Sequence, residues 1–245
     1  MKVSVVSYKR PNNQTCNMLM KTNFDWKVYV YLFDEHLNEY ISNYQTHVRV
    51  INEMDSPNLA IKRQLVLNDA IIEKVDYLVM LDDDIQKITL NNNESNLTDA
   101  LIFLLEFAYN NNQYVAVSAA YHFNKPDIVE NKNICNNSIF NIKKYMKSNV
   151  KYNKDSKCED AEFTIDLLLN GFKTARLGTL VINNVLQGGQ DDTGLAYRFK
   201  DNRFIIEGDY LSQRYPELYI FDYDETHLSI KTNLIKGDAI WKSNY

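Results

Sequence analysis

The apolar run of residues 77–81 is followed at once by three aspartates, Asp82, Asp83 and Asp84. A short apolar run without polar alternation predicts a strand that is buried on both faces, as in a parallel sheet. Such a strand delivers its last residues to the carboxyl edge of the sheet, where open α/β folds bind ligands. The sequence therefore predicts an acidic ligand site at this edge.

The three aspartates are expected to differ in direction. Side chains alternate along an extended strand, so Asp82 and Asp84 should lie on one side and Asp83 on the other. Two carboxylates on one side repel each other unless a cation lies between them, and oxygen ligands of this kind suit Mg²⁺ or Mn²⁺. We therefore expect Asp82 and Asp84 to ligate a divalent metal ion. The alternative is a solvated acidic turn without a ligand.

Strand-like and helix-like segments alternate along the chain, which is typical of a parallel sheet with crossover helices. Strands are expected over residues 3–7, 26–33, 48–51, 77–81, 114–120, 138–142, 172–177 and 180–182. Helices are expected over residues 35–44, after Asn58, over 97–108 and over 160–169. The predicted fold class is α/β, with a mainly parallel central sheet and helices on both faces.

Two helices carry specific expectations. In the helix after Asn58, we expect Ile61, Leu65 and Ile72 to share one face, with Lys62 and Arg63 in the first turns. The helix over 160–169 is followed by Asn170-Gly171, and Gly171 can take the left-handed conformation that ends helices.

Length and composition indicate a single domain in a reducing compartment. The 245 residues are 45% hydrophobic, enough for a sizeable core, and no linker divides them. No apolar run approaches the ~20 residues of a membrane span, and a strand-like segment occupies the place of a secretory signal. The three cysteines form no metal-type pair. We expect a cytoplasmic protein that does not bind membranes.

Positive charge is concentrated in one segment. The chain has a net charge of −5, yet residues 143–157 contain six lysines and a single acid, Asp155, a local net charge of +5. Tyr145 and Tyr152 lie among these lysines. Lysines can follow phosphates and aromatic rings can stack on bases, so the segment is a candidate polyanion-binding surface. The alternative is a solvated surface loop.

Three segments, in this order, resemble motifs of the GT-A-fold glycosyltransferases: residues 3–11, the Asp-x-Asp motif within 81–85, and Glu159-Asp160 with its helix. The resemblance covers about residues 1–180. It implies a nucleotide-diphosphate sugar donor, expected to be a UDP-sugar, bound in a half of about residues 1–90, with an acceptor half of about 91–245. It also implies Mn²⁺ or Mg²⁺ between the donor and Asp82 and Asp84. The donor-side residues implied are Ser7, Tyr8, Arg10, Pro11, Arg63, Asp82 and Asp83, the last of these contacting ribose or sugar.

The resemblance also implies a catalytic base. Attack by an acceptor hydroxyl requires a base, and a carboxylate near the sugar can serve. Asp160 is expected to be that base, with Glu159 beside it. The alternative is that Asp160 only caps its helix. For Arg63 the alternative is a solvated helix charge.

The acceptor is expected from the lysine segment and from a closer resemblance. Together with residues 187–189, which could form a mobile loop over the donor, the segment resembles phage-type glycosyltransferases that modify hydroxymethylated pyrimidines in DNA, relatives of the base J glucosyltransferase. The acceptor would then be modified DNA, in the host cytoplasm if the protein is phage-encoded. The acceptor-binding residues expected are Lys144, Lys147, Lys151 and His122, with Tyr145 or Tyr152 stacking on a flipped base. Transfer to a glycan or lipid-linked saccharide, and a non-catalytic sugar-nucleotide-binding module, remain alternatives.

Overall fold

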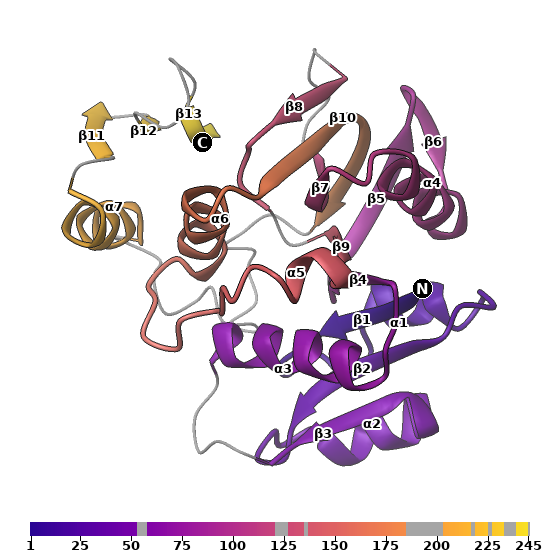
Figure 1. The fold of residues 1–245 in the computed structure, drawn as a ribbon. Helices are drawn as coiled ribbons and strands as arrows, with labels where there is room; N and C mark the ends of the chain where they lie inside the picture. The colour runs from indigo at the N-terminus through magenta and orange to yellow at the C-terminus, as the bar shows by residue number, and fades with distance from the viewer. Residues whose placement is uncertain are drawn as a thin grey trace.

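The computed structural model describes residues 1–52, 58–120, 127–134, 137–184, 203–216, 219–224, 227–232 and 239–244. Its main body is one large sheet covered by helices (Figure 1). A smaller sheet of three antiparallel strands lies near the C-terminus, and consists of β11 (Tyr219–Asp224), β12 (His227–Thr232) and β13 (Ala239–Asn244). Within the described residues, no helix is long and apolar enough to cross a membrane.

The large sheet has ten strands. Its order is β3 (Val48–Ile51), β2 (Trp26–Tyr31), β1 (Lys2–Val6), β4 (Tyr77–Asp82), β9 (Ser138–Asn141), β7 (Tyr114–Ala120), β10 (Lys173–Asn184), β5 (Ile85–Leu90) and β6 (Asn93–Ser95), with β8 (Ile128–Glu130) paired to β10. β3, β2, β1 and β4 pair in parallel. β9 runs antiparallel to both β4 and β7, and β7 pairs in parallel with β10. The strands that form the centre of the sheet therefore share one direction apart from β9, as predicted.

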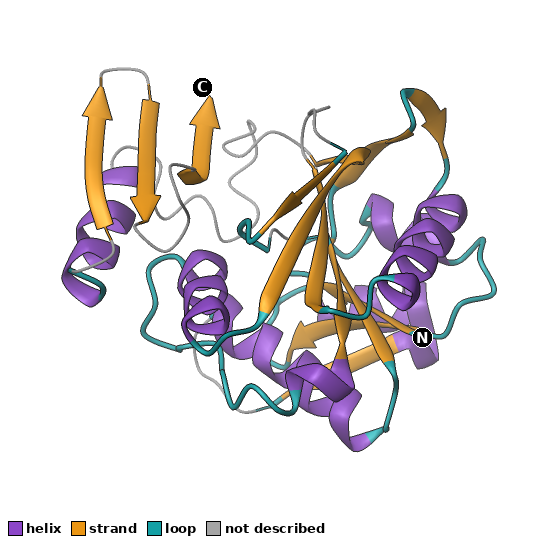
Figure 2. Ribbon diagram, turned by 45° about the horizontal axis from the view of Figure 1, so that its top comes forward, coloured by secondary structure: helices purple, strands orange, loops and turns teal. Residues whose placement is uncertain are grey.

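Helices cover both faces of this sheet, which Figure 2 shows from a second side. The helices are α1 (Gln14–Leu19), α2 (Leu37–Tyr44), α3 (Leu59–Ile72), α4 (Leu97–Asn110), α5 (Ile142–Tyr145), α6 (Glu159–Leu169) and α7 (Arg203–Arg214), with a 3₁₀ turn at Gln45–His47. Buried residues of α1, α2 and α4 form one core cluster with the sheet. Buried residues of α3, α5 and α6 form the cluster on the opposite face.

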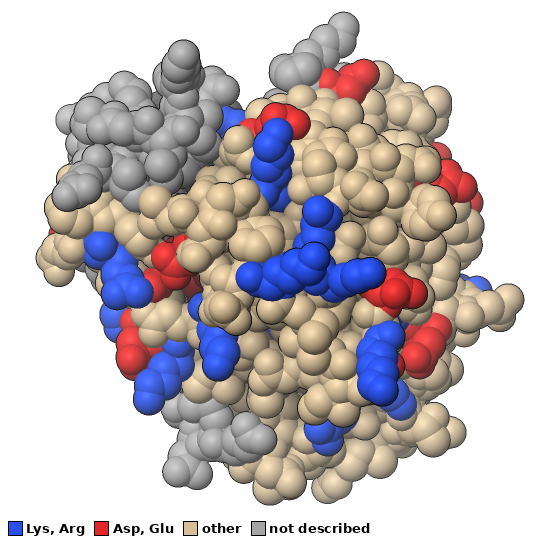
Figure 3. Space-filling view, in the orientation of Figure 1, with Lys and Arg blue, Asp and Glu red and all other residues tan. Residues whose placement is uncertain are grey.

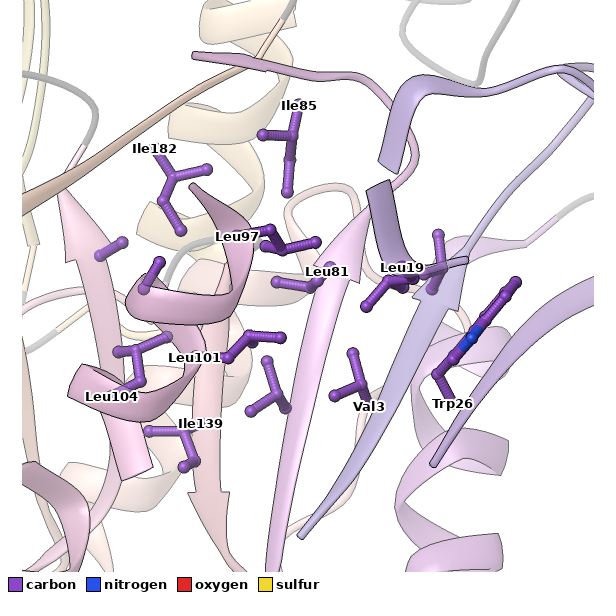
Figure 4. Close-up of a cluster of buried hydrophobic side chains, with 14 of the residues drawn as sticks. Val3, Leu19, Trp26, Leu81, Ile85, Leu97, Leu101, Leu104, Ile139 and Ile182 are labelled. Atoms are coloured by element: carbon purple, nitrogen blue, oxygen red, sulfur yellow. The ribbon is translucent and has the colours of Figure 1, made fainter. Parts of the chain in front are cut away.

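β4 shows why the sequence folds in this way. Val79 and Leu81 belong to the first cluster, and Leu78 and Met80 belong to the second. All four side chains are buried, and burying one such side chain contributes about 1.5–3 kcal/mol. Figure 4 shows Leu81 of β4 among side chains of α1, α4 and the neighbouring strands. The expectation of a strand buried on both faces is confirmed.

The predicted face of α3 was wrong. Ile72 is 74% exposed, whereas Lys62 and Arg63 are 1% and 2% exposed. The apolar part of the buried face is made by Ala60, Val66, Leu67 and Ala70. The apolar pattern was misleading because Lys62 and Arg63 face the sheet. Polar groups at the carboxyl edge of the sheet give these two cations buried partners.

Two further elements differ from the prediction. The segments 172–177 and 180–182 belong to a single strand, β10, whose pairing with β7 shifts register between Leu177 and Val181. The hairpin of β5 and β6 was not predicted. Its turn is Asn91-Asn92, and both residues have positive φ, 51° and 67°. Asparagine tolerates this conformation, which two-residue hairpin turns of the I′ type require.

Candidate functional site

Asp82 ends β4 at the carboxyl edge of the sheet and is held by two asparagines. The Asn184 amide donates to Asp82 Oδ2 at 3.0 Å, and the Asp82 backbone N–H donates to Asn137 Oδ1 at 3.3 Å. The Asn137 amide donates in turn to Asn184 Oδ1 at 3.0 Å, which closes a ring of hydrogen bonds. Asn184 donates to the carboxylate and Asn137 accepts from the backbone, and both are neutral, so they orient Asp82 without neutralising its charge.

Asp83 and Asp84 contact one guanidinium group. Arg10 Nη1 donates to Asp83 Oδ1 at 2.8 Å and to Asp84 Oδ2 at 3.0 Å. The expectation that Asp83 and Asp84 point to opposite sides was therefore wrong. β4 stops pairing with β1 at Asp82, and side chains alternate only while the backbone stays extended.

A closed network fixes the loop that follows β1. The Arg10 backbone N–H donates to the Tyr40 hydroxyl at 2.9 Å, the Tyr40 and Ser7 hydroxyls share a hydrogen bond of 2.5 Å, and the Ser7 hydroxyl donates to Asp83 Oδ2 at 2.6 Å. Ser7, Tyr40 and Asp83 are all buried. The structure thus brings the predicted residues Ser7, Arg10 and Asp83 together. Tyr40 was not predicted, because a tyrosine in an amphipathic helix is read as a core residue.

The remaining residues of this loop lie beside the network. The Tyr8 ring packs edge-on against the Tyr31 ring, with centroids 6.2 Å apart. The Pro11 carbonyl accepts a hydrogen bond from the Asn43 amide at 2.9 Å. Both contacts fix the course of the loop at the carboxyl end of β1.

Lys62 lies beneath the same loop. Its ammonium group donates to the Ser7 carbonyl oxygen and lies 4.0 Å from the centroid of the Tyr31 ring. Burial lowers the pKa of Lys62 to about 7, although the charges of Asp83 and Asp34 oppose the shift. Lys62 therefore links α3 to the loop after β1.

Arg63 links the aspartates to α6. Its Nη1 lies 3.2 Å from Glu159 Oε1, and its Nη2 lies 3.9 Å from Asp82 Oδ1. Burial lowers the pKa of Arg63, but the nearby charges of Glu159 and Asp82 outweigh that effect and raise it. The guanidinium is thus a permanent buried cation between the Asp-x-Asp motif and the Glu159-Asp160 motif. It is not a solvated helix charge.

Asp160 lies in the first turn of α6 and is oriented from a neighbouring segment. The Asn133 amide donates to Asp160 Oδ2 at 3.3 Å, and the Thr164 hydroxyl contacts both Asn133 Oδ1, at 2.9 Å, and the Asp160 carbonyl, at 2.7 Å. Asn133 is fully buried. The N-cap residue of α6 is Cys158, whose side chain makes no capping hydrogen bond. The Ala161 backbone N–H donates to Asp160 Oδ1 at 2.8 Å, so Asp160 does accept a hydrogen bond from the first turn of its helix, and its role as a base stays a prediction.

The carboxylate of Asp84 is in an unfavourable setting for a charge. Burial and the neighbouring charge of Asp83 raise the pKa of Asp84 to about 6, although Arg10 opposes the shift. Its Oδ1 atom is buried and accepts no hydrogen bond. A buried carboxylate oxygen without a donor fits a divalent cation as the missing partner. Within the described residues, no three His, Cys, Asp or Glu side chains are grouped to hold a metal ion.

The lysine segment divides between two edges of the sheet. Asn141 pairs with Tyr77, the first residue of β4, so Lys144 of α5 and Lys147 follow at the edge opposite the aspartates. Six residues of strand separate these edges by roughly 17 Å. The chain then returns along α3, and the Lys154 carbonyl accepts a hydrogen bond from Asn58, the N-cap residue of α3. Figure 3 shows positive side chains gathered over the region of α5.

Tyr145 and Tyr152 are core residues. The Tyr152 ring stacks on Phe163 of α6, with centroids 4.0 Å apart, and Tyr145 donates its hydroxyl hydrogen to the Val150 carbonyl at 2.9 Å. Tyr145 is 4% exposed and Tyr152 is 7% exposed. Neither ring can stack on a flipped base in this arrangement, so that expectation was wrong. His122 and residues 187–189 lie outside the described residues.

A search of solved structures finds proteins with a similar fold. A mannosyltransferase from Pyrobaculum calidifontis in complex with GDP-Man and Mn²⁺ is similar, with a TM-score of 0.54, 11% identity and 88% of this chain covered. The chain has the GT-A fold. It spans 62% of the length of that mannosyltransferase.

Two other similar structures are more distant. A CMP-2-keto-3-deoxy-manno-octonic acid synthetase complexed with CTP has a TM-score of 0.47, 8% identity, and coverage of 84% of this chain and 98% of its own. A nucleotide-diphospho-sugar transferase from Desulfovibrio desulfuricans G20 has a TM-score of 0.45, 12% identity, and coverage of 87% and 97%. No protein family description matches the sequence, and no curated protein matches it.

Proposed function

We propose that the chain is a glycosyltransferase that moves a sugar from a nucleotide-diphosphate sugar to an acceptor hydroxyl. The observation that carries this proposal is the position of Arg63 between Asp82 and Glu159. One buried guanidinium thus holds the end of β4 and the start of α6 together at the ligand edge of a GT-A sheet. The first motif suits a donor diphosphate and the second suits an acceptor.

The donor is proposed to lie over residues 1–90. Arg10, whose side chain is 28% exposed, can contact the diphosphate, and the loop of Ser7, Tyr8 and Pro11 would contact the nucleoside. A UDP-sugar is the proposed donor. Asp82 and Asp84 would hold a Mn²⁺ or Mg²⁺ ion, with donor phosphates and water completing its ligands, since such ions commonly use one or two protein carboxylates. The bound ion would stabilise the charge of the departing diphosphate.

Asp160 is the proposed base. As the acceptor oxygen bonds to the anomeric carbon, the sugar–phosphate bond breaks and its electron pair leaves with the nucleoside diphosphate. The hydroxyl proton passes to the Asp160 carboxylate, which Asn133 keeps oriented. Glu159 is paired with Arg63, so its proposed role is to position α6 rather than to take the proton.

The proposed acceptor is a hydroxyl on a polyanion, and specifically a hydroxymethylated pyrimidine in DNA. The support is the local charge of +5 within residues 143–157, whose second part leads directly into α6 and Asp160. Lys151, Lys154 and Lys157 are exposed there. Lys144 and Lys147, at the other edge of the sheet, would contact only a long acceptor.

The test is turnover of a panel of UDP-, GDP- and CMP-sugars with Mn²⁺ or with a chelator, in the presence of hydroxymethylated DNA or of neutral saccharides. We expect metal-dependent transfer from a nucleotide-diphosphate sugar. Asp160→Asn should abolish transfer but leave donor affinity within about 3-fold, because the base acts only in the reaction. Failure of every donor to bind or react would contradict the proposal, and transfer to saccharides alone would overturn the DNA acceptor.

A further inference from the structure

Arg10 places a positive charge on Asp84, one of the two carboxylates proposed to hold the metal ion. Its Nη1 contacts Asp83 and Asp84 together, and its backbone is fixed through the Tyr40 hydroxyl. The contact with Asp83 is supported from the other side, because Ser7 donates to the second oxygen of Asp83. Arg10 is therefore anchored by Asp83 whether or not it also contacts Asp84.

Arg10 already occupies one of the two oxygens of Asp84. Oδ2 accepts a hydrogen bond from Arg10 at 3.0 Å. Oδ1 is buried and has no hydrogen-bond partner. A metal ion bound at Oδ1 would therefore share the Asp84 carboxylate with the Arg10 guanidinium. A divalent cation and a guanidinium at one carboxylate also repel each other, most strongly where water is excluded.

The donor itself offers Arg10 another partner. A guanidinium binds phosphate oxygens with two parallel hydrogen bonds, at least as well as it binds one carboxylate oxygen. The Arg10 side chain is 28% exposed, more than Asp83 at 8% and Asp84 at 18%, so it borders the space that a diphosphate would enter. Moving Arg10 from Asp84 to a phosphate requires only a side-chain movement.

We propose that Arg10 is an exchangeable counter-cation. It neutralises Asp84 before a donor binds, and passes to the donor diphosphate when Asp84 takes the divalent ion. This inference rests on the proposed function. The exchange predicts that metal and donor bind cooperatively, because both favour the arrangement in which Arg10 contacts the diphosphate and Asp84 contacts the metal ion. Each ligand should then strengthen the binding of the other by the same factor.

The experiment measures Mn²⁺ binding from the signal of free Mn²⁺ in electron paramagnetic resonance, with and without saturating UDP or GDP. For the unaltered protein we expect the nucleoside diphosphate to tighten Mn²⁺ binding by at least about 10-fold, within the usual range of coupling. For Arg10→Gln we expect tighter Mn²⁺ binding in the absence of nucleotide, by about 10-fold, and a coupling reduced to about 3-fold or less.

Two matched variants separate this effect from net charge. Lys9→Gln removes one positive charge from the neighbouring residue, whose ammonium group pairs with Glu35, and should leave Mn²⁺ binding and coupling unchanged. Arg10→Lys keeps the charge and should keep weak Mn²⁺ binding. If Arg10→Gln does not fold, the coupling between Mn²⁺ and nucleotide binding, measured in the unaltered protein and in Arg10→Lys, still tests the exchange.

The outcomes distinguish the inference from the function. Cooperative binding that is lost in Arg10→Gln supports the exchange. Independent binding of Mn²⁺ and nucleotide, or weaker Mn²⁺ binding in Arg10→Gln, overturns the exchange while leaving the glycosyltransferase proposal intact. Binding of neither Mn²⁺ nor any nucleoside diphosphate overturns both.

Discussion

At the scale of single residues, the candidate site uses two kinds of partner for its carboxylates. Asp82 and Asp160 accept hydrogen bonds from asparagine amides, and Arg63 lies 3.9 Å from Asp82, whereas Asp83 and Asp84 are paired directly with Arg10. An amide leaves the carboxylate charge available for a metal ion or for a proton, and an arginine compensates it. The sequence did not indicate these asparagines, because the chain is rich in them and only their contacts single out Asn133, Asn137 and Asn184.

Asn133 provides the prediction at this scale. Asn133→Leu, of similar size, removes the donor to Asp160, and outer partners of this kind typically contribute 10–100-fold to activity. We expect kcat for transfer to fall by about that factor, with the donor dissociation constant unchanged. Thr164→Val, which removes the hydroxyl that contacts Asn133, should reproduce part of the loss.

Transfer kinetics and donor binding measured on the same preparations check this prediction. A loss of donor affinity equal to the loss of kcat would show that Asn133 supports the structure of the whole site and does not position Asp160. Unchanged kcat in Asn133→Leu would remove Asn133 from the account altogether.

At the scale of elements, apolar patterns in the sequence predicted where strands and helices lie. They did not predict which polar side chains are buried. The strands over residues 48–51 and 114–120 and the helix α4 lie where the sequence predicted them. Gly171 ends α6 with φ +78°, as expected. The orientation of α3 was mispredicted, because the partners of Lys62 and Arg63 come from distant parts of the chain. Periodicity within one helix carries no information about such partners.

Lys62 gives α3 a measurable pH signature. In the unfolded chain Lys62 keeps its proton up to its ordinary pKa of 10.5, but in the folded protein it loses it at about 7. Between these values the unfolded state binds more protons, so this group makes the free energy of unfolding rise with pH. Below pH 6 the group is charged in both states and contributes no slope.

Lys62→Met removes this contribution. We expect the free energy of unfolding of the unaltered protein, minus that of Lys62→Met, to be constant below pH 6 and to rise by about 2 kcal/mol between pH 7 and pH 9. Urea denaturation of both proteins across this range measures it. A difference that stays constant to pH 9 would mean that buried Lys62 keeps its proton.

At the scale of the whole molecule, the order of the motifs along the chain was enough to predict the GT-A fold. The sequence could not show how the lysine segment is distributed, because that depends on β9 running antiparallel beside β4. The antiparallel strand carries α5 to the edge opposite the aspartates, and only the second part of the segment returns to α6. A cluster in sequence thus became two groups in space.

These two groups provide a matched test of the acceptor. Lys151, Lys154 and Lys157 replaced together by Gln remove the same charge as Lys143, Lys144 and Lys147 replaced together by Gln. If hydroxymethylated DNA is the acceptor, each lost phosphate contact lowers the salt slope of binding by about 0.9. We expect the first triple variant to lower the slope by about 2–3 and the second to lower it by less than 1.

Binding of the modified DNA at several salt concentrations measures both slopes. Equal changes in the two variants would indicate a general attraction of positive charge, and no change in either would remove the polyanion from the account. Donor hydrolysis is the internal control and should be the same in all three proteins.

The central claim is that the carboxylates after β4 bind a nucleotide-sugar diphosphate through a divalent ion. The most direct measurement is calorimetric binding of UDP-sugars and GDP-sugars with Mn²⁺ or with a chelator, for the unaltered protein, Asp84→Asn and Asp76→Asn. Asp76 is exposed and precedes the other end of β4, so Asp76→Asn is the matched control. We predict binding that requires Mn²⁺ in the unaltered protein and in Asp76→Asn, and that is at least about 100-fold weaker in Asp84→Asn. Equal binding by all three proteins, with and without Mn²⁺, would contradict the account.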